Sequence, residues 1–336
     1  MRMTTNLASI AFVLALLTVS NADTFLEGPN QFDIEFVTIG SPGNEPFRND
    51  SGDVAYEYRM GKFEISRQQI QLANQLGGLE ISIDDLGFLD GGPRPELPAS
   101  GISTNEAARF VNWLNESKGL PHAYKFETQP GEEGYDSNAF FQAWELDEPG
   151  YNPDNILRNA LAQYVVPTDQ EWVKAAYYDP PAGDVAAGYR GGIRAVPGEQ
   201  FNTWRVSNGL IVDVMAAGED EVTGLVGMIG NVWEVNETPH DLVITDPLDA
   251  TFHRLRGGGW FAAFTDERGY GPNSYELQSY QIERLASGFR VASLSEPSGC
   301  WLVGFAFIFA LCSRKQRSTR HSECGSLPHL SSPPSP

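Results

Sequence analysis

Cysteine and positive charge are both scarce in this chain of 336 residues. The three cysteines, Cys300, Cys312 and Cys324, lie close to the C-terminal end, so residues 23–295 contain none. That segment therefore has no thiol to serve as a disulfide partner, a nucleophile, a redox centre or a copper ligand. Asp and Glu number 44 against 23 Lys and Arg, which gives a formal net charge of −21. This charge argues against nucleic acid and anionic lipid as partners because both would be repelled.

Nucleotide-binding patterns and long apolar runs are missing as well. The chain has neither Gly-x-x-x-x-Gly-Lys-Ser/Thr nor Gly-x-Gly-x-x-Gly, and no apolar run reaches the roughly 17–25 residues of a membrane-spanning helix. Apolar residues make up 41% of the sequence and aromatic residues 11%, enough for a sizeable core. The 34 glycines and 22 prolines favour a globular domain that is rich in loops.

Residues 1–22 have the pattern that is typical of a secretory signal peptide. Arg2 and the amino terminus precede the uncharged run Leu7–Val19, and the small residues Ser20 and Ala22 follow it. We therefore predict cleavage after Ala22 and export of the protein. A buried N-terminal helix is the alternative.

A second short apolar run lies near the C-terminal end. Glu296-Pro297 leads into Gly299–Cys312, and a basic cluster, Arg314–Arg317, follows. This order resembles the PEP-CTERM sorting tail of exported bacterial proteins, although the first proline of that motif is Ser295 here. For residues 296–317 the resemblance implies transient or retained anchoring in the inner membrane, with the protein in the cell envelope or outside the cell. A short core helix is the alternative, and the Ser/Pro-rich residues 318–336 are expected to be disordered.

Three capping boxes predict helices in residues 23–295. Each has Ser or Thr followed three residues later by Gln or Glu. They are Ser66 with Gln69, Ser103 with Glu106, and Thr168 with Glu171. The first predicts a helix over Arg67–Leu76 that stops at Gly77-Gly78, and strands are predicted at Ile34–Ile39 and Tyr56–Ile65. From about Pro180 onward the pattern fixes no regular element, so the sequence indicates an α+β domain with few helices.

Five segments, in order along the chain, resemble one protein family. They include an Ala-rich helix ending in Trp-Leu, a Gly-Asn-Val-Trp-Glu motif, Arg-Gly-Gly-Gly-Trp and Gly-Phe-Arg. The segments are Pro98–Gly119, Val166–Trp172, Gly224–Glu234, Arg256–Trp260 and Gly288–Arg290. Together they resemble the formylglycine-generating enzymes, also called sulfatase-modifying factors. The resemblance implies that residues 23–295 form an α+β, single loop-rich domain of the formylglycine-generating-enzyme or C-type-lectin-like fold.

The resemblance also implies a copper-dependent oxidation, for which this chain lacks the cysteine ligands. Enzymes of the family oxidise a substrate cysteine with copper held by two cysteines shortly after the Arg-Gly-Gly segment. The corresponding positions fall on or near Ala262 and near Glu267, which offer no soft ligand. We therefore expect no copper and no such oxidase activity. The leading hypothesis is an exported binding or structural module for an extracellular ligand, whether glycan, peptide or matrix.

Two other functions stay open at this point. Asp266 and Glu267 stand where the cysteines would be, and they could serve a metal-dependent oxidoreductase or another enzyme with non-cysteine ligands. A calcium-dependent component of the surface matrix is the third hypothesis. The histidines of the domain, His122, His240 and His253, are widely spaced and are interpreted as chance residues rather than an iron site.

Calcium is the cofactor that the resemblance still allows. Family members bind it in the Gly-Asn-Val-Trp-Glu loop and at a second site. Carried over to this chain, the loop ligands would be the carbonyls of Gly230 and Val232 and the carboxylate of Glu234, and Asn202 resembles a ligand of the second site. Gly227 falls where the family supplies a side-chain oxygen, so the ligand set is incomplete for a cation that wants six to eight oxygens. The alternative is that Glu234 is a hydrogen-bond acceptor that holds a loop.

The remaining motif residues are predicted to be scaffold. Four tryptophans should pack in the core because they are large and lie beside small residues. These are Trp113, Trp172, Trp233 and Trp260. Arg256 and Arg290 should form buried, planar hydrogen bonds to carboxylates or carbonyls.

Overall fold

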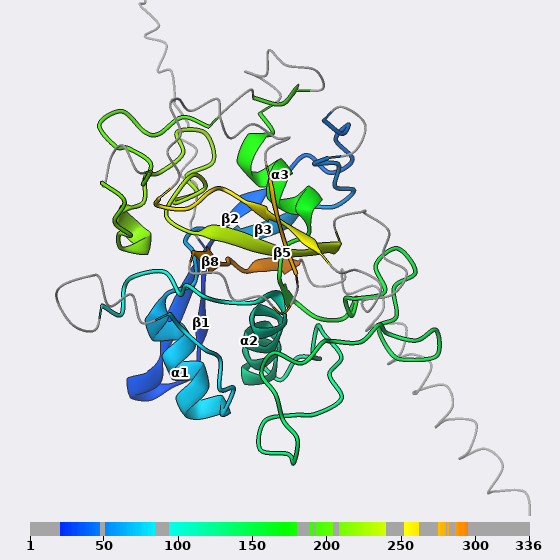
Figure 1. Cartoon of the computed structure of the whole chain (residues 1–336). Helices are drawn as coiled ribbons and strands as arrows, with labels where there is room; N and C mark the ends of the chain where they lie inside the picture. The colour runs from blue at the N-terminus through cyan, green and yellow to red at the C-terminus, as the bar shows by residue number, and fades with distance from the viewer. Residues whose placement is uncertain are drawn as a thin grey trace, which may run out of the picture. The chain divides into compact units, whose positions relative to one another are not determined.

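The fold was analysed in a computed structural model of the chain (Figure 1). It describes residues 21–47, 51–84, 94–179, 188–190, 193–203, 208–239, 252–261, 275–279, 281 and 286–294. The chain divides into two units, Met1–Leu294 and Ser295–Pro336, and every described residue belongs to the first. None of the helices in this described part is long and apolar enough to cross a membrane. The C-terminal segment and nearly all of the predicted signal peptide lie outside it.

The first sheet has five strands, all antiparallel to their neighbours. Its order is β1-β2-β3-β9-β4. The strands are β1 (Asn21–Phe25), β2 (Phe32–Ile39), β3 (Tyr58–Gly61), β9 (Ala292–Leu294) and β4 (Tyr164–Val165). In β2, Ile34 and Phe36 are buried while Asp33 is exposed, because successive side chains of a strand point to opposite faces. This strand confirms the prediction for Ile34–Ile39.

The second sheet has four strands in the order β7-β6-β5-β8. They are β7 (Glu276–Gln278), β6 (His253–Arg256), β5 (Trp233–Pro239) and β8 (Ser287–Gly288). β5 pairs with β6 antiparallel and with β8 parallel. All seven residues of β5 are buried, including Glu234, Asn236 and Glu237. A strand that carries buried carboxylates needs partners for them, and these partners define the site described below.

Three α-helices begin at the three predicted capping boxes. They are α1 (Arg67–Gly77), α2 (Thr104–Ser117) and α3 (Asp169–Tyr177). In each, the Ser or Thr hydroxyl before the helix accepts a hydrogen bond from the backbone amide three residues on, and the Gln or Glu side chain at that position accepts one from the backbone amide of the Ser or Thr. α1 packs against α2, α2 against β4 and β5, and α3 against β5 (Figure 1). Short 3₁₀ turns occur at Gly28–Asn30 and at Val214–Ala216, labelled η3.

The predicted strand Tyr56–Ile65 is longer than the strand that forms. β3 covers Tyr58–Gly61 only. After Gly61 the chain leaves the sheet, Glu64 turns inward to contact Asn231, and Ser66 already caps α1. The strand therefore ends before Glu64, whose side chain makes a buried hydrogen bond with Asn231.

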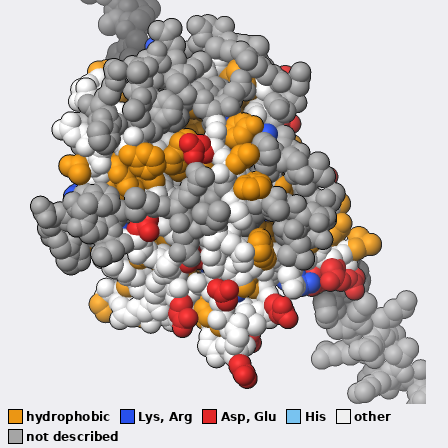
Figure 2. All heavy atoms as spheres, viewed as in Figure 1, with side chains coloured by type: hydrophobic (Ala, Val, Ile, Leu, Met, Phe, Trp, Pro, Cys, Tyr) orange, Lys and Arg blue, Asp and Glu red, His pale blue; other side chains and the backbone are white. Residues whose placement is uncertain are grey.

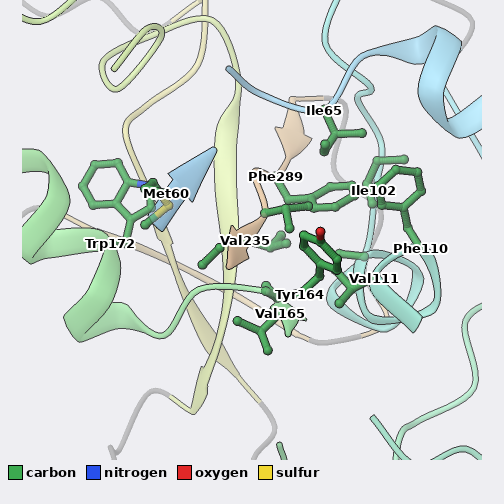
Figure 3. Close-up of a cluster of buried hydrophobic side chains, with 14 of the residues drawn as sticks. Met60, Ile65, Ile102, Phe110, Val111, Tyr164, Val165, Trp172, Val235 and Phe289 are labelled. Carbon is green, nitrogen blue, oxygen red and sulfur yellow. The ribbon is translucent and has the colours of Figure 1, made fainter. Parts of the chain in front are cut away.

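The core lies where the helices meet both sheets. Figure 3 shows side chains from α2 (Phe110, Val111), β4 (Tyr164) and β5 (Val235) converging around Phe289. The Phe110 and Phe289 rings make an edge contact with centroids 5.6 Å apart. The four predicted tryptophans are at most 7% exposed, which confirms them as core residues.

Candidate functional site

Glu234, on β5, is bound by two groups that come from distant parts of the chain. Arg290 donates from Nε to Oε2 at 2.7 Å and from Nη2 to Oε1 at 2.5 Å. The Trp172 indole donates to Oε2 at 2.7 Å. The remaining donors of Arg290 reach the backbone carbonyls of Gly61 and Val226. This arrangement confirms the prediction of planar hydrogen bonds for Arg290. Glu234 accepts hydrogen bonds from both Trp172 and Arg290, so it connects β5 to α3 and to the segment that follows β8.

A second buried carboxylate, Glu64, lies beside this pair. Asn231 donates to its Oε2 at 2.6 Å and the backbone amide of Val232 to its Oε1 at 3.2 Å. Burial, together with the negative charge of Glu234, raises the pKa of Glu64 to about 8. Arg290 opposes this rise but makes its bidentate pair with Glu234 alone. This buried cluster therefore holds two acids and one guanidinium.

The loop around Gly230 brings two distant segments into close contact. Asn231 donates its backbone amide to the carbonyl of Asn202 at 2.8 Å, and the Asn202 side chain donates to Asn231 Oδ1 at 2.8 Å. Gly230 has a φ of +80°, and a Cβ there would lie 2.1 Å from the Asn202 carbonyl oxygen. Asn202 Oδ1 is buried and accepts no hydrogen bond from any described residue.

The predicted calcium ligands are therefore only partly brought together. Asn202 and Gly230 are neighbours, and Val232 follows on the same loop. Glu234 does not fit a calcium ligand because a guanidinium and an indole N–H hold both of its oxygens. Over the described ranges, no three His, Cys, Asp or Glu side chains are grouped to hold a metal ion. Calcium binding by the Gly230 and Val232 carbonyls in the loop, and by Asn202 at the second site, stays a prediction.

The residues proposed for altered pocket chemistry cannot be placed. Asp266 and Glu267 lie outside the described residues, as does His240. His253 on β6 is buried with both ring nitrogens within 3.2 Å of Thr104 Oγ1, whereas His122 lies in a loop, 3.8 Å from Glu116.

A second buried cluster surrounds Arg158. Its guanidinium donates to both oxygens of Glu171, at 2.9 and 3.1 Å, and to Glu237 at 3.1 Å. The hydroxyls of Tyr56 and Tyr124 donate to Glu171 and Glu237 at 2.6 and 2.5 Å. Burial alone would raise the pKa of Glu171, yet the charge of Arg158 lowers it overall, whereas burial raises the pKa of Glu237. The cluster ties α3 to β5.

Three further arginine–carboxylate pairs are buried: two link α3 to the second sheet, and the third joins two loops. Arg256 donates to the two oxygens of Asp169 at 2.6 and 2.7 Å, and Arg254 adds a bond at 3.0 Å. Arg190 makes a bidentate pair with Asp220 at 2.8 and 2.9 Å. The prediction for Arg256 is confirmed. Asp169 and Asp220 form ion pairs with arginines, so neither carboxylate is available as a general base.

Sequence reasoning missed several residues of these clusters. The missed residues are Glu64, Arg158, Arg190, Asp220, Asn231, Glu237 and Arg254. Two of them carried a usable signal: Glu64 stands between Phe63 and Ile65, and Asn231 lies inside the Gly-Asn-Val-Trp-Glu motif. Arg158 lies in a loop with no local pattern, so only the fold brings it to its partners.

Two antiparallel-rich sheets, few helices, and loops tied by buried arginine–carboxylate pairs define a formylglycine-generating-enzyme-like domain. A family profile described as "Sulfatase-modifying factor enzyme 1-like domain" matches residues 48–294. The chain belongs to this family.

Solved structures share the fold at low sequence identity. "Treponema denticola variable protein 1" matches with a TM-score of 0.54 and 17% identity, over 82% of this chain and 99% of that one. CarF matches with a TM-score of 0.51 and 17% identity, over 78% of this chain and 98% of the other. No curated protein sequence gave a significant match.

Proposed function

We propose that this protein is an exported member of the family that lacks the copper-dependent oxidase activity and acts at the cell surface as a binding or structural module. The observation that carries the proposal is the absence of cysteine from residues 23–295. Copper(I) requires soft thiolate or thioether ligands. The three methionines of the domain do not replace them as a group, because Met60 and Met228 are buried whereas Met215 is 72% exposed on η3.

The charged clusters support a scaffold role. Glu234, Glu171 and Asp169 each bind an arginine through both carboxylate oxygens. Breaking such a buried pair leaves an uncompensated charge, so the pairs hold the loops in one arrangement. A rigid core that carries long loops is suited to presenting a binding surface. The ligand class expected on the outside of a cell is a glycan, a peptide or a matrix component.

Export is supported by the two ends of the sequence and is compatible with the first strand. Cleavage after Ala22 would leave Asp23 and Phe25 in place. Asp23 binds Arg59 at 2.7 and 2.8 Å, and Phe25 is fully buried against Tyr164. The processed chain would thus keep these contacts and the pairing of Asp23–Phe25 with β2, and would lose the pairing of Asn21 and Ala22 with Phe36 and Glu35.

The oxidase assay tests the proposal directly. The purified full-length protein is incubated with copper and a cysteine-containing peptide, and aldehyde formation is followed by hydrazide labelling and mass spectrometry. A family enzyme that retains both copper cysteines is the positive control. We expect labelling no higher than in the protein-free reaction. Cysteine turnover by this protein would overturn the non-oxidase function, and would bring Asp266 and Glu267 forward as candidate ligands.

Export is tested separately by N-terminal sequencing. The full-length gene is expressed in a bacterial host and the protein is recovered from the cell envelope and the medium. We expect the chain to begin at Asp23. Recovery of a chain that still begins at Met1, confined to the cytoplasm, would contradict the export part of the proposal.

A further inference from the structure

Asn208 and Gly209 form the only Asn-Gly pair in the chain. They lie in the loop that leads to η3, and Asn208 is exposed to solvent. The backbone φ is +54° at Asn208 and +76° at Gly209. Positive φ at two successive residues is the turn conformation that favours Asn-Gly, because asparagine tolerates this region and glycine has no side chain to oppose it. The pair therefore combines an exposed side-chain amide with an adjacent backbone nitrogen that no Cβ covers.

Hydrogen bonds do not hold this pair in place. Among the described residues, neither the Asn208 side chain nor the backbone N–H of Gly209 has a hydrogen-bond partner. Asn138, which precedes an alanine, is a contrast: its Oδ1 accepts from Ser103 Oγ at 2.8 Å and its Nδ2 donates to the Gln281 carbonyl at 2.8 Å. The Asn208 amide and the peptide bond that follows it can therefore rotate without breaking a hydrogen bond to the described part of the chain.

The loop that follows the pair is anchored to the domain. Asn202 Nδ2 donates to the Leu210 carbonyl at 3.1 Å, and the Val212 amide donates to Asn231 Oδ1 at 3.1 Å. Asn231 belongs to the Gly-Asn-Val-Trp-Glu motif. A change in the backbone at the Asn-Gly pair would therefore act on a loop that is tied to this motif.

We propose that Asn208 is a site of non-enzymatic deamidation. The backbone nitrogen of Gly209 loses its proton to hydroxide and attacks Cγ of Asn208. The new N–C bond closes a five-membered succinimide ring, and the side-chain nitrogen takes up a proton and leaves as ammonia. Water then opens the ring at either of its two carbonyls, so that aspartate or isoaspartate replaces Asn208. The sequence of steps needs no oxidant, reductant or cofactor.

Deamidation changes both the charge and the backbone of the loop. Each conversion replaces a neutral amide by a carboxylate in a segment, residues 23–295, that already carries 42 acidic against 18 basic side chains. Figure 2 shows carboxylates well outnumbering Lys and Arg on the face in view. The isoaspartate form also adds one carbon to the backbone beside the loop that Asn202 and Asn231 anchor. This modification goes beyond the proposed function and does not rest on it.

The test follows the purified full-length protein during incubation at mildly alkaline pH and physiological temperature. Peptide mapping by mass spectrometry measures conversion at Asn208 and at Asn138, and a synthetic peptide of residues 205–212 gives the rate of the unprotected sequence. We expect Asn208 to convert within about tenfold of the rate of the peptide, faster as the pH rises, while Asn138 stays intact. An Asn208 that is still intact after the peptide has been converted, or equal conversion at Asn138, would overturn the assignment.

Two variants test the chemistry at this pair. Gly209→Ala adds a Cβ beside the attacking nitrogen and should slow conversion roughly tenfold or more. Asn208→Gln keeps Gly209 but would have to close a six-membered ring, so labelling of isoaspartate by a protein isoaspartyl methyltransferase should disappear. Thermal unfolding verifies that both variants are folded. Labelling that persists in Asn208→Gln would place the isoaspartate elsewhere in the chain and overturn the site. The measurement is independent of the oxidase assay, so failure here and failure of the proposed function are distinguishable.

Discussion

Arg290 and Glu234 form a bidentate ion pair whose two side chains are both fully buried. Replacing Arg290 by Met should destabilise the protein by about 3–5 kcal/mol, because Glu234 would be left as an unpaired carboxylate beside Glu64. Urea unfolding measures the loss.

Arg94→Met provides the matched control for this change. Arg94 pairs with Asp213 at 3.2 Å, but both side chains are about 40% exposed, so the loss should stay below about 1 kcal/mol. Adding Glu234→Leu to Arg290→Met should recover part of the stability if the unpaired charge is the cause. A loss for Arg290→Met no larger than that for Arg94→Met would contradict the role given to this pair.

Gly230 should tolerate no side chain. Its φ is +80°, and a Cβ added at this position would lie 2.1 Å from the Asn202 carbonyl oxygen, which would force the two loop segments apart. Gly230→Ala should therefore cost more than about 3 kcal/mol in urea unfolding. Gly119→Ala is the control: its φ is +69° with no atom within 4 Å of the added Cβ, so only the backbone strain of about 1 kcal/mol is expected. Similar decreases in the free energy of unfolding for the two variants would show that the contact between Gly230 and Asn202 is not tight.

The parts of the fold that could be predicted from the sequence are those fixed by local signals. The capping boxes at Ser66, Ser103 and Thr168 each require only four adjacent residues, and all three helices begin where they indicate. The burial of Arg256 and Arg290 was likewise predictable, because an arginine within an apolar, Gly-rich motif needs a planar acceptor.

The second sheet and the charged clusters depend on contacts between distant residues. β5 reads as a polar segment, Trp233–Pro239, yet all of it is buried because Arg158 and Arg290 reach its carboxylates from elsewhere in the chain. β8 pairs with β5 in parallel and is only two residues long, too short for any periodic pattern. The local hydrophobic pattern therefore could not identify these strands.

The Asp23–Arg59 pair should make the stability depend on acidic pH. Burial alone would raise the pKa of Asp23, but the hydrogen bonds from Arg59 and Tyr164 lower it below its ordinary value of 3.8. The stabilisation is therefore present above that value and is lost as the pH falls through the lower pKa of the folded state. We expect Asp23→Asn to cost about 1 kcal/mol at pH 7 and almost nothing near pH 2, in urea titrations at a series of pH values. Glu27→Gln, at an exposed position nearby, is the control. A loss that does not change with pH would show that the charge of Asp23 contributes little.

The effect of calcium on the melting temperature distinguishes calcium binding at Asn202 from calcium binding at Glu234. If the buried Oδ1 of Asn202 is a ligand, calcium at about 100 times its dissociation constant should raise the melting temperature by roughly 5 °C, and a chelator should reverse the rise. Asn202→Ala should abolish this shift. Because that variant also loses hydrogen bonds to Leu210 and Asn231, the comparison is between the shifts with and without calcium rather than the absolute temperatures. Glu234→Gln should lower the melting temperature but keep the shift, because its carboxylate is held by Arg290 and not offered to a cation. Loss of the shift in Glu234→Gln with its retention in Asn202→Ala would reverse this assignment and place the cation at the arginine-bound carboxylate.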